Sequence, residues 1–404
     1  MIDLDAPVPD RPQPPGGSRG FALILAVAVC LATLHSVPGG ERTVRTLWTA
    51  PPARTLNIQA GPDTVWALRV VDASGGELTA YEMATGRVRW TRPAAATTAV
   101  NGGFSVLPAA GILLVDDLAV DAATGAALWR VPGVVDGHDT GTVLVREPDA
   151  LRLVAARDGT TIWRRPMDGT RVVRIQPRNG RPSTIVVGTG ELTLLRYHDG
   201  AELLSRPIPR DGDLLAGDGH IVLLRYGISA FSIVGYRPDT LAESWRIETV
   251  GGAVQECGPV LCLSGSHGVT GIDPVTGTSR WTLPPGYGAG AVTGDRIVVT
   301  RQPRNSGEGR QPLISMVDAS SGRRIGAEVA GHPIVSSTGG GRLLVIRSNP
   351  QPVAPASVFT LDAATGSSRL IGSVDYQLLN APYELAGRHL LRLRDGRLEV
   401  MTVG

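Results

Sequence analysis

Short apolar runs alternate with polar, glycine-containing turns along most of the chain. Runs at residues 221–224 and 231–234 precede one such turn, and a similar pair at residues 260–263 and 269–272 precedes another. Apolar runs of this length, bounded by turn residues, predict short buried β-strands. Because no long stretch after residue 40 has the apolar spacing of a helix, the pattern predicts repeated units of four antiparallel strands.

A short motif of the form Asp-x-x-Thr-Gly-x-x-x-Trp follows these paired runs. Its two best copies contain Asp121, Thr124, Gly125 and Trp129, and Asp273, Thr276, Gly277 and Trp281. Asp and Thr side chains bond to nearby backbone amides, and Gly supplies the positive φ that closes a tight turn. We expect the large ring that follows the turn to cover an apolar face of a sheet.

The spacing of the tryptophans indicates the length of the repeat. Six of the seven lie in the motif or in a similar β-prone segment: Trp48, Trp90, Trp129, Trp163, Trp245 and Trp281. The equivalent positions, 48, 90, 129, 163, 204, 245, 281, 326 and 370, are 34 to 45 residues apart. This spacing is close to the ~40 to 50 residues of one propeller blade. The predicted fold class is therefore an all-β propeller of four-stranded antiparallel blades.

The repeated motif resembles the PQQ-like β-propeller repeat, which occurs in quinone-dependent dehydrogenases and in non-enzymatic envelope proteins. The resemblance covers roughly residues 43–404 and is specific for the fold, because the motif recurs in register. The repeated residues form turns and pack against one another. The motif therefore implies little about function.

Blade number is predicted from the turns. Eight turn signals lie near Gly86, Gly125, Gly159, Gly200, Thr240, Gly277, Gly322 and Gly366. Since propellers typically have about four to eight blades, the prediction is eight. A further pair of strands at the C-terminus, around residues 390–393 and 398–401, leaves an alternative open. If the strand around Trp48 completes that pair, the ring closes through the two chain ends and has nine blades.

The N-terminus differs in kind from the repeats. Residues 1–19 contain five prolines and are expected to form a disordered cytoplasmic tail. Residues 20–37 contain a long uncharged run and at ~1.5 Å per residue could span a bilayer as a signal-anchor helix. Arg11 and Arg19 precede this run, which predicts a single-pass cell-membrane protein with its propeller outside the cytoplasm. Cleavage and secretion remain the alternative, although no good Ala-x-Ala site is present.

Cysteine usage and charge add two expectations. Cys257 and Cys262 flank a Gly-Pro turn and are expected to form a disulfide across a hairpin in an exported domain, with reduced thiols as the alternative. All 39 basic residues are Arg, and the net charge is only +2. The arginines are spread over all repeats, so we expect no nucleic-acid partner.

Candidate site residues are few. The seven histidines show no metal-binding spacing, and no metal site is predicted. His138, His220 and His332 fall near the starts of blades and are the candidates to face a central channel.

Two function classes remain open. The first is a binding or interaction scaffold for a protein, a cell-envelope component or a small molecule, with no cofactor. The second is a PQQ-dependent dehydrogenase, for which the resemblance implies a calcium-bound quinone, a catalytic Asp and often an adjacent cysteine pair. The sequence contains no adjacent cysteines and no segment that aligns with those calcium ligands. This favours the scaffold, and an enzymatic role is not expected.

Overall fold

All regular structure in the described part of the chain is β-strand, according to the computed structural model. The described residues are 44–51, 54–72, 75–94, 104–115, 117–130, 133–167, 172–178, 181–188, 190–209, 212–227, 231–302, 311–335, 343–349, 354–374, 383–394 and 396–403. They form nine four-stranded antiparallel sheets, which we number as blades 1 to 9.

The first four blades follow one another directly along the chain. Blade 1 contains β2 (Arg54–Ala60), β3 (Thr64–Asp72), β4 (Gly75–Glu82) and β5 (Val88–Ala94); blade 2 contains β6 (Phe104–Leu107), β7 (Ile112–Val115), β8 (Leu118–Asp121) and β9 (Ala127–Arg130); blade 3 contains β10 (Val134–His138), β11 (Thr142–Arg146), β12 (Ala150–Ala155) and β13 (Thr161–Pro166); and blade 4 contains β14 (Val172–Arg178), β15 (Arg181–Gly188), β16 (Glu191–Arg196) and β17 (Glu202–Pro207).

Blades 5 to 8 continue the same order, and blade 9 combines both chain ends. Blade 5 contains β18 (Asp213–Gly217), β19 (His220–Tyr226), β20 (Phe231–Tyr236) and β21 (Glu243–Thr249); blade 6 contains β22 (Ala253–Cys257), β23 (Val260–Gly265), β24 (Gly268–Ile272) and β25 (Ser279–Leu283); blade 7 contains β26 (Tyr287–Thr293), β27 (Arg296–Arg301), β28 (Leu313–Asp318) and β29 (Arg324–Ala330); blade 8 contains β30 (His332–Val335), β31 (Leu343–Asn349), β32 (Ala354–Leu361) and β33 (Ser368–Val374); and blade 9 contains β34 (Tyr383–Ala386), β35 (His389–Arg394), β36 (Arg397–Val403) and β1 (Val44–Thr49).

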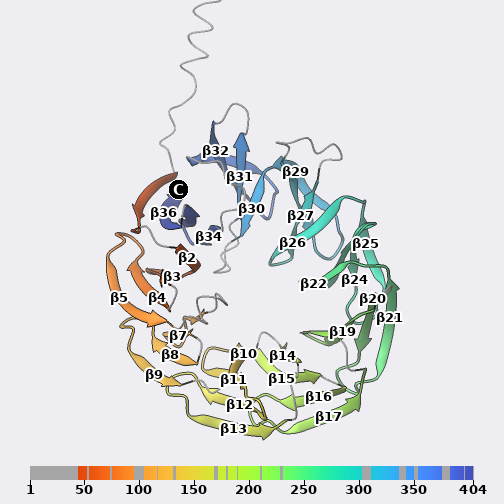
Figure 1. Cartoon of the computed structure of the whole chain (residues 1–404). Coiled ribbons are helices and arrows are strands. Elements are labelled where there is room, and N and C mark those ends of the chain that lie inside the picture. The colour runs from red at the N-terminus through yellow and green to blue at the C-terminus, as the bar shows by residue number, and fades with distance from the viewer. Residues whose placement is uncertain are drawn as a thin grey trace, which may run out of the picture. The chain divides into compact units, whose positions relative to one another are not determined.

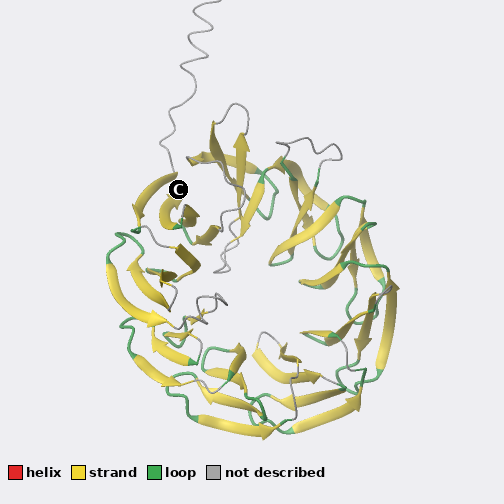
Figure 2. Ribbon diagram, viewed as in Figure 1, coloured by secondary structure: helices red, strands yellow, loops and turns green. Residues whose placement is uncertain are grey.

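The blades follow one another around a ring (Figure 1). Inner strands such as β10 and β14 lie toward the centre, whereas β13, β17 and β21 lie on the outer rim. Strands joined by turns account for the whole described ring (Figure 2). The predicted propeller of four-stranded antiparallel blades is therefore confirmed.

The predicted number of eight blades was wrong, because the described chain forms nine. All eight predicted turns exist, and each joins the third strand of a blade to the fourth. In blade 9 the fourth strand is β1, which pairs with β36 from Val44 opposite Val403 to Thr49 opposite Glu399. That blade has no turn between its third and fourth strands, so counting turns could not reveal it.

Side chains of the motif fold each turn as its chemistry predicts. The Oδ1 atom of Asp121 accepts hydrogen bonds from the amide of Ala123 at 3.0 Å and from the amide of Thr124 at 2.7 Å. The hydroxyl of Thr124 donates to the same oxygen at 2.8 Å. Gly125 follows with a φ of 74°, a value that residues with a side chain adopt only at a cost.

A β-bulge directly precedes each tryptophan of the repeat. In blade 2, Trp129 pairs with Ala119 and Ala127 pairs with Val120, so that Leu128 is the extra residue. The residues at the equivalent bulge position are Leu47, Arg89, Leu128, Ile162, Leu203, Ser244 and Arg280. A bulge bends the strand and re-aims the side chain that follows it. Here it precedes an indole that contacts the next blade.

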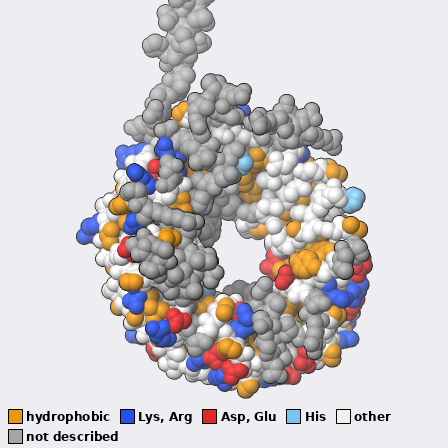
Figure 3. Space-filling view, in the orientation of Figure 1, with side chains coloured by type: hydrophobic (Ala, Val, Ile, Leu, Met, Phe, Trp, Pro, Cys, Tyr) orange, Lys and Arg blue, Asp and Glu red, His pale blue; other side chains and the backbone are white. Residues whose placement is uncertain are grey.

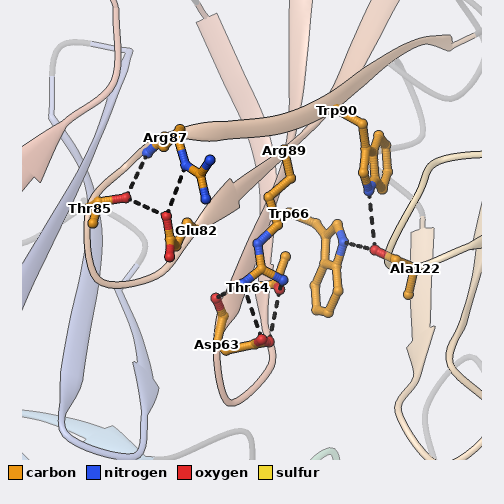
Figure 4. A network of polar contacts seen from close by, with 9 residues as sticks. All are labelled: Asp63, Thr64, Trp66, Glu82, Thr85, Arg87, Arg89, Trp90 and Ala122. Atoms are coloured by element: carbon orange, nitrogen blue, oxygen red, sulfur yellow. Dashed lines mark hydrogen bonds and ion pairs between the residues drawn. The ribbon is translucent and has the colours of Figure 1, made fainter.

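Each indole lies against the turn glycine of the following blade. A methyl group built on Gly125 of blade 2 would lie 2.7 Å from Cδ2 of Trp90 in blade 1. The indole Nε1 of Trp90 donates to the carbonyl oxygen of Ala122 in the same turn at 3.2 Å, and Trp66 of blade 1 donates to that oxygen at 3.4 Å (Figure 4). The indole of Trp90 therefore covers an apolar surface, as expected, but this surface belongs to the next blade.

The same contact recurs around the ring. The tryptophan and glycine pairs are Trp48 with Gly86, Trp90 with Gly125, Trp129 with Gly159, Trp163 with Gly200, Trp245 with Gly277, and Trp281 with Gly322. In every pair the indole also donates to a carbonyl oxygen of the turn segment, at 2.8 to 3.2 Å. Because adjacent blades are separate sheets, this contact joins them.

Where the tryptophan is replaced, the contact with the next blade is different. Leu204 of blade 4 packs in one cluster with the fully buried Leu241 of blade 5, which has a φ of 53° at the glycine position. Gly326 of blade 7 brings its backbone directly against Gly366 of blade 8. In blade 8 the bulge falls at Ile371, after Leu370, and Leu370 is 59% exposed.

We predict that Trp281→Ala lowers the free energy of unfolding by ~3 to 5 kcal/mol, the cost of removing a buried aromatic side chain. Trp281 is 8% exposed and donates to the carbonyl oxygen of Ala319 at 2.9 Å. Leu370→Ala is the matched control, since the same motif position is exposed there, and should change stability by less than about 0.5 kcal/mol. Urea denaturation measures both, and equal losses would refute the role assigned to the indole.

Candidate functional site

The three candidate histidines lie in three different blades. His138 ends β10 of blade 3 and is exposed, whereas His332 begins β30 of blade 8 and is half-buried, which lowers its pKa. His220 begins β19 of blade 5, is 7% exposed, and has its Nε2 atom 3.7 Å from Oε1 of Glu256 in blade 6. The ring is open at its centre (Figure 3). His138 and His332 lie on the first strands of their blades and His220 lies on a second strand, and their role in a channel site stays a prediction.

Polar side chains tie some inner strands to their neighbours. The amide group of Gln59 in blade 1 donates to the carbonyl oxygen of Phe104 in blade 2 and accepts from the amide of Val106 at 3.1 Å. Gln255 of blade 6 donates to the carbonyl oxygen of Gly290 in blade 7 at 2.6 Å. These bonds join the first strands of neighbouring blades, and no motif in the sequence indicates them.

The turns between third and fourth strands carry a series of carboxylates. Hydrogen bonds from the hydroxyls of Ser320 and Ser321, at 2.6 and 2.8 Å, lower the pKa of the Asp318 carboxyl to about 2. The hydroxyl and backbone amide of Thr124 likewise lower the pKa of Asp121. These carboxylates bond to their own turns, so the predicted role of Asp121 and Asp273 in turn formation is confirmed.

A cavity of about 290 Å³ opens between blades 3 and 4. Its lining residues are Arg165, Pro166, Met167, Val187, Glu191, Thr193, Leu195 and Glu202. Blade 3 supplies the wall from the end of β13 and the residue after it, and blade 4 supplies the floor from β15 and β16. The cavity therefore lies at a junction between blades rather than in the central opening.

A buried ion network holds the blade 3 wall of this cavity. The carboxylate of Glu147, which is 8% exposed, accepts hydrogen bonds from Arg152 and from Arg164, the latter at 2.8 Å. Arg164 also donates to Asp149 at 2.9 Å. The next residue, Arg165, pairs instead with Glu202 of blade 4. The adjacent residues Arg164 and Arg165 thus differ in role, since Arg164 bonds within blade 3 and Arg165 lines the cavity.

The predicted disulfide between Cys257 and Cys262 is present, with the two Cα atoms 5.8 Å apart. Both residues are fully buried in blade 6. The cysteines are diagonal rather than directly opposed, because Cys257 pairs with Val260 and Cys262 pairs with Gln255. The disulfide links the first two strands of the blade next to their tight turn.

The repeat is matched by one family model. The PQQ-like model described as "Outer membrane protein assembly factor BamB" matches residues 74–216, from β4 of blade 1 to β18 of blade 5. This match confirms the expected PQQ-like repeat over residues 74–216, and the described ring as a whole is a β-propeller. No curated protein sequence matches the chain significantly.

Solved structures share the fold at low sequence identity. A crystal structure of a eukaryotic initiation factor is 11% identical to this chain and has a TM-score of 0.55. The match covers 83% of this chain and 94% of that protein's chain. BamB from Moraxella catarrhalis is 14% identical to this chain and has a TM-score of 0.38, and the match covers 89% of this chain and 97% of the BamB chain. At such identities the first likeness shows the fold alone.

Metal-binding groups and membrane-spanning helices can be assessed only for the described residues. Among these residues, no three His, Cys, Asp or Glu side chains form a group that could hold a metal ion. No helix in the described part of the chain is long and apolar enough to cross a membrane. The predicted tail and membrane segment at residues 1–37 lie outside the described residues.

We predict that Asp318→Asn reduces the loss of stability in acid. The carboxylate has a folded-state pKa of about 2, below its ordinary value of about 3.9. At pH values above that ordinary pKa the carboxylate therefore stabilises the folded state, and this stabilisation is lost as the pH falls through about 2. Asparagine does not titrate, so the free energy of unfolding should fall less between pH 5 and pH 2 in the variant. Identical pH profiles in urea denaturation would contradict the assigned pKa.

Proposed function

We propose that the chain is a membrane-anchored propeller outside the cytoplasm that serves as an interaction scaffold for another protein of the cell envelope. The observation that carries this proposal is that the repeated residues have structural roles. Their carboxylates and hydroxyls bond within turns, and their indoles join one blade to the next. The repeat thus builds a rigid ring, and recognition falls to the loops and the rim.

The family match supports a role in the cell envelope. It covers residues 74–216, and the matched model is described as an outer membrane protein assembly factor. From that description we infer for this chain only a class of function, namely association with other envelope proteins. The identity of the partner has to come from experiment.

Two features support the proposed location. The buried disulfide in blade 6 suits an oxidising compartment, since disulfides are rare in reducing cytosol. The uncharged run within residues 20–37 has the length and composition of a membrane anchor, and Arg11 and Arg19 precede it.

We predict that the full chain stays in the membrane pellet after a carbonate wash and that protease added from outside digests the propeller. The matched control carries Leu25→Arg and Val29→Arg, each of which costs about 2.5 to 3.5 kcal/mol at the centre of a membrane helix. The control should remain soluble in the cytoplasm. A native chain that behaves like this control would overturn the proposal, and a shortened, exported, soluble chain would overturn the anchor alone.

A further inference from the structure

The cavity between blades 3 and 4 is lined both by apolar side chains and by carboxylates. Val187 and Leu195 on the floor are each 1% exposed, and Met167 on the wall is 9% exposed. Glu191 and Glu202 also line the cavity. A long side chain with an apolar stem and a polar end matches this division.

The described lining of the cavity contains two carboxylates, Glu191 and Glu202, and a single arginine, Arg165. Arg165 pairs with Glu202. Glu191 is partly shielded from solvent, and an incoming cation would complement its carboxylate.

The size of the cavity favours a single side chain. Pockets for small molecules usually measure about 300 to 1,000 Å³, and this cavity, at about 290 Å³, falls just below that range. Lys and Arg carry three or four methylene groups before the charged head, and such stems pack along apolar surface.

Three successive blades expose an apolar residue at the bulge position: Leu128, Ile162 and Leu203 of blades 2 to 4 are 43%, 48% and 39% exposed. The same position is polar in blades 1, 5 and 6, where it holds Arg89, Ser244 and Arg280, and apolar in blade 9, where it holds Leu47. Ile162 and Leu203 lie on the two outer strands, β13 and β17, that also carry Arg165 and Glu202. Figure 3 shows hydrophobic and acidic side chains together along the lower rim, where blades 3 and 4 lie.

We propose that this rim is the docking surface for a protein partner, which inserts one Lys or Arg side chain into the cavity between blades 3 and 4. The stem packs against Val187, Leu195 and Met167, and the charged head bonds to the carboxylate of Glu191. Apolar residues beside the inserted one cover Ile162 and Leu203. The proposal rests on the scaffold function proposed above and names the surface and the chemistry that it recognises.

The test is photo-crosslinking of the full chain in the cells that produce it. A photoreactive residue replaces Ile162 or Leu203 on the rim, or Val275 or Tyr226 elsewhere; the last two are each 60% exposed. Each version is combined with Glu191→Gln, or with Glu248→Gln as the control. Glu248 lies on the outer strand β21 of blade 5, and its side chain is 56% exposed. Melting temperatures confirm that the variants are folded.

We expect Ile162 and Leu203 to crosslink to a segment that contains Lys or Arg. Glu191→Gln should reduce this crosslinking by about tenfold or more, the effect of losing one hydrogen bond between charged groups, and Glu248→Gln should leave it unchanged. Glu191→Lys should abolish it, and replacing the partner's basic residue by Glu should restore it.

Other outcomes separate this inference from the proposed function. Rim crosslinks that are insensitive to Glu191→Gln, or that reach a segment without a basic residue, would overturn the role of the cavity. Crosslinks from Val275 or Tyr226 alone would keep the scaffold and overturn this surface. No crosslink from any of the four positions would overturn both.

Discussion

Six of the nine blade junctions in the described ring depend on one contact, that between the indole of one blade and the turn glycine of the next. Each blade is a separate hydrogen-bonded sheet, so side chains must join it to its neighbour. The indole does so with its face on the glycine and its Nε1–H on a carbonyl oxygen of the same turn. A side chain at the glycine would occupy the space of the ring. This explains why Trp and Gly recur together.

Much of this architecture could be predicted from the sequence, because the motif contains the residues that make the turn and the packing. The pairing of each Trp with the glycine of the following blade could not, since the bulge residue before it varies from Leu128 to Arg280 and has no common chemistry. Counting turns favoured eight blades because the fourth strand of blade 9 is β1, which leaves no turn to recognise, whereas the alternative of nine blades, closed by the strand around Trp48, is the one that the structure shows. The disulfide was predictable because its two cysteines flank a short turn.

The candidate site was much less visible in the sequence. His138, His220 and His332 were chosen by their position near blade starts, and they lie in three separate blades. The cavity residues Arg165, Glu191 and Glu202 are ordinary in sequence and come together only because two blades meet. Residues that repeat thus describe the fold, whereas the proposed recognition surface is built from positions that differ between blades.

The most direct measurement is the effect of Gly125→Ala on stability, compared with Gly111→Ala and repeated in a chain that carries Trp90→Ala. Both glycines have positive φ, 74° and 67°, but only Gly125 faces an indole, and a methyl group on Gly111 would meet nothing within 4 Å. We expect Gly125→Ala to cost about 1 to 3 kcal/mol more than Gly111→Ala, because the methyl group displaces Trp90. This excess should disappear once the indole is removed. Equal costs at the two glycines, or an excess that persists without Trp90, would contradict the joining of blades by this contact.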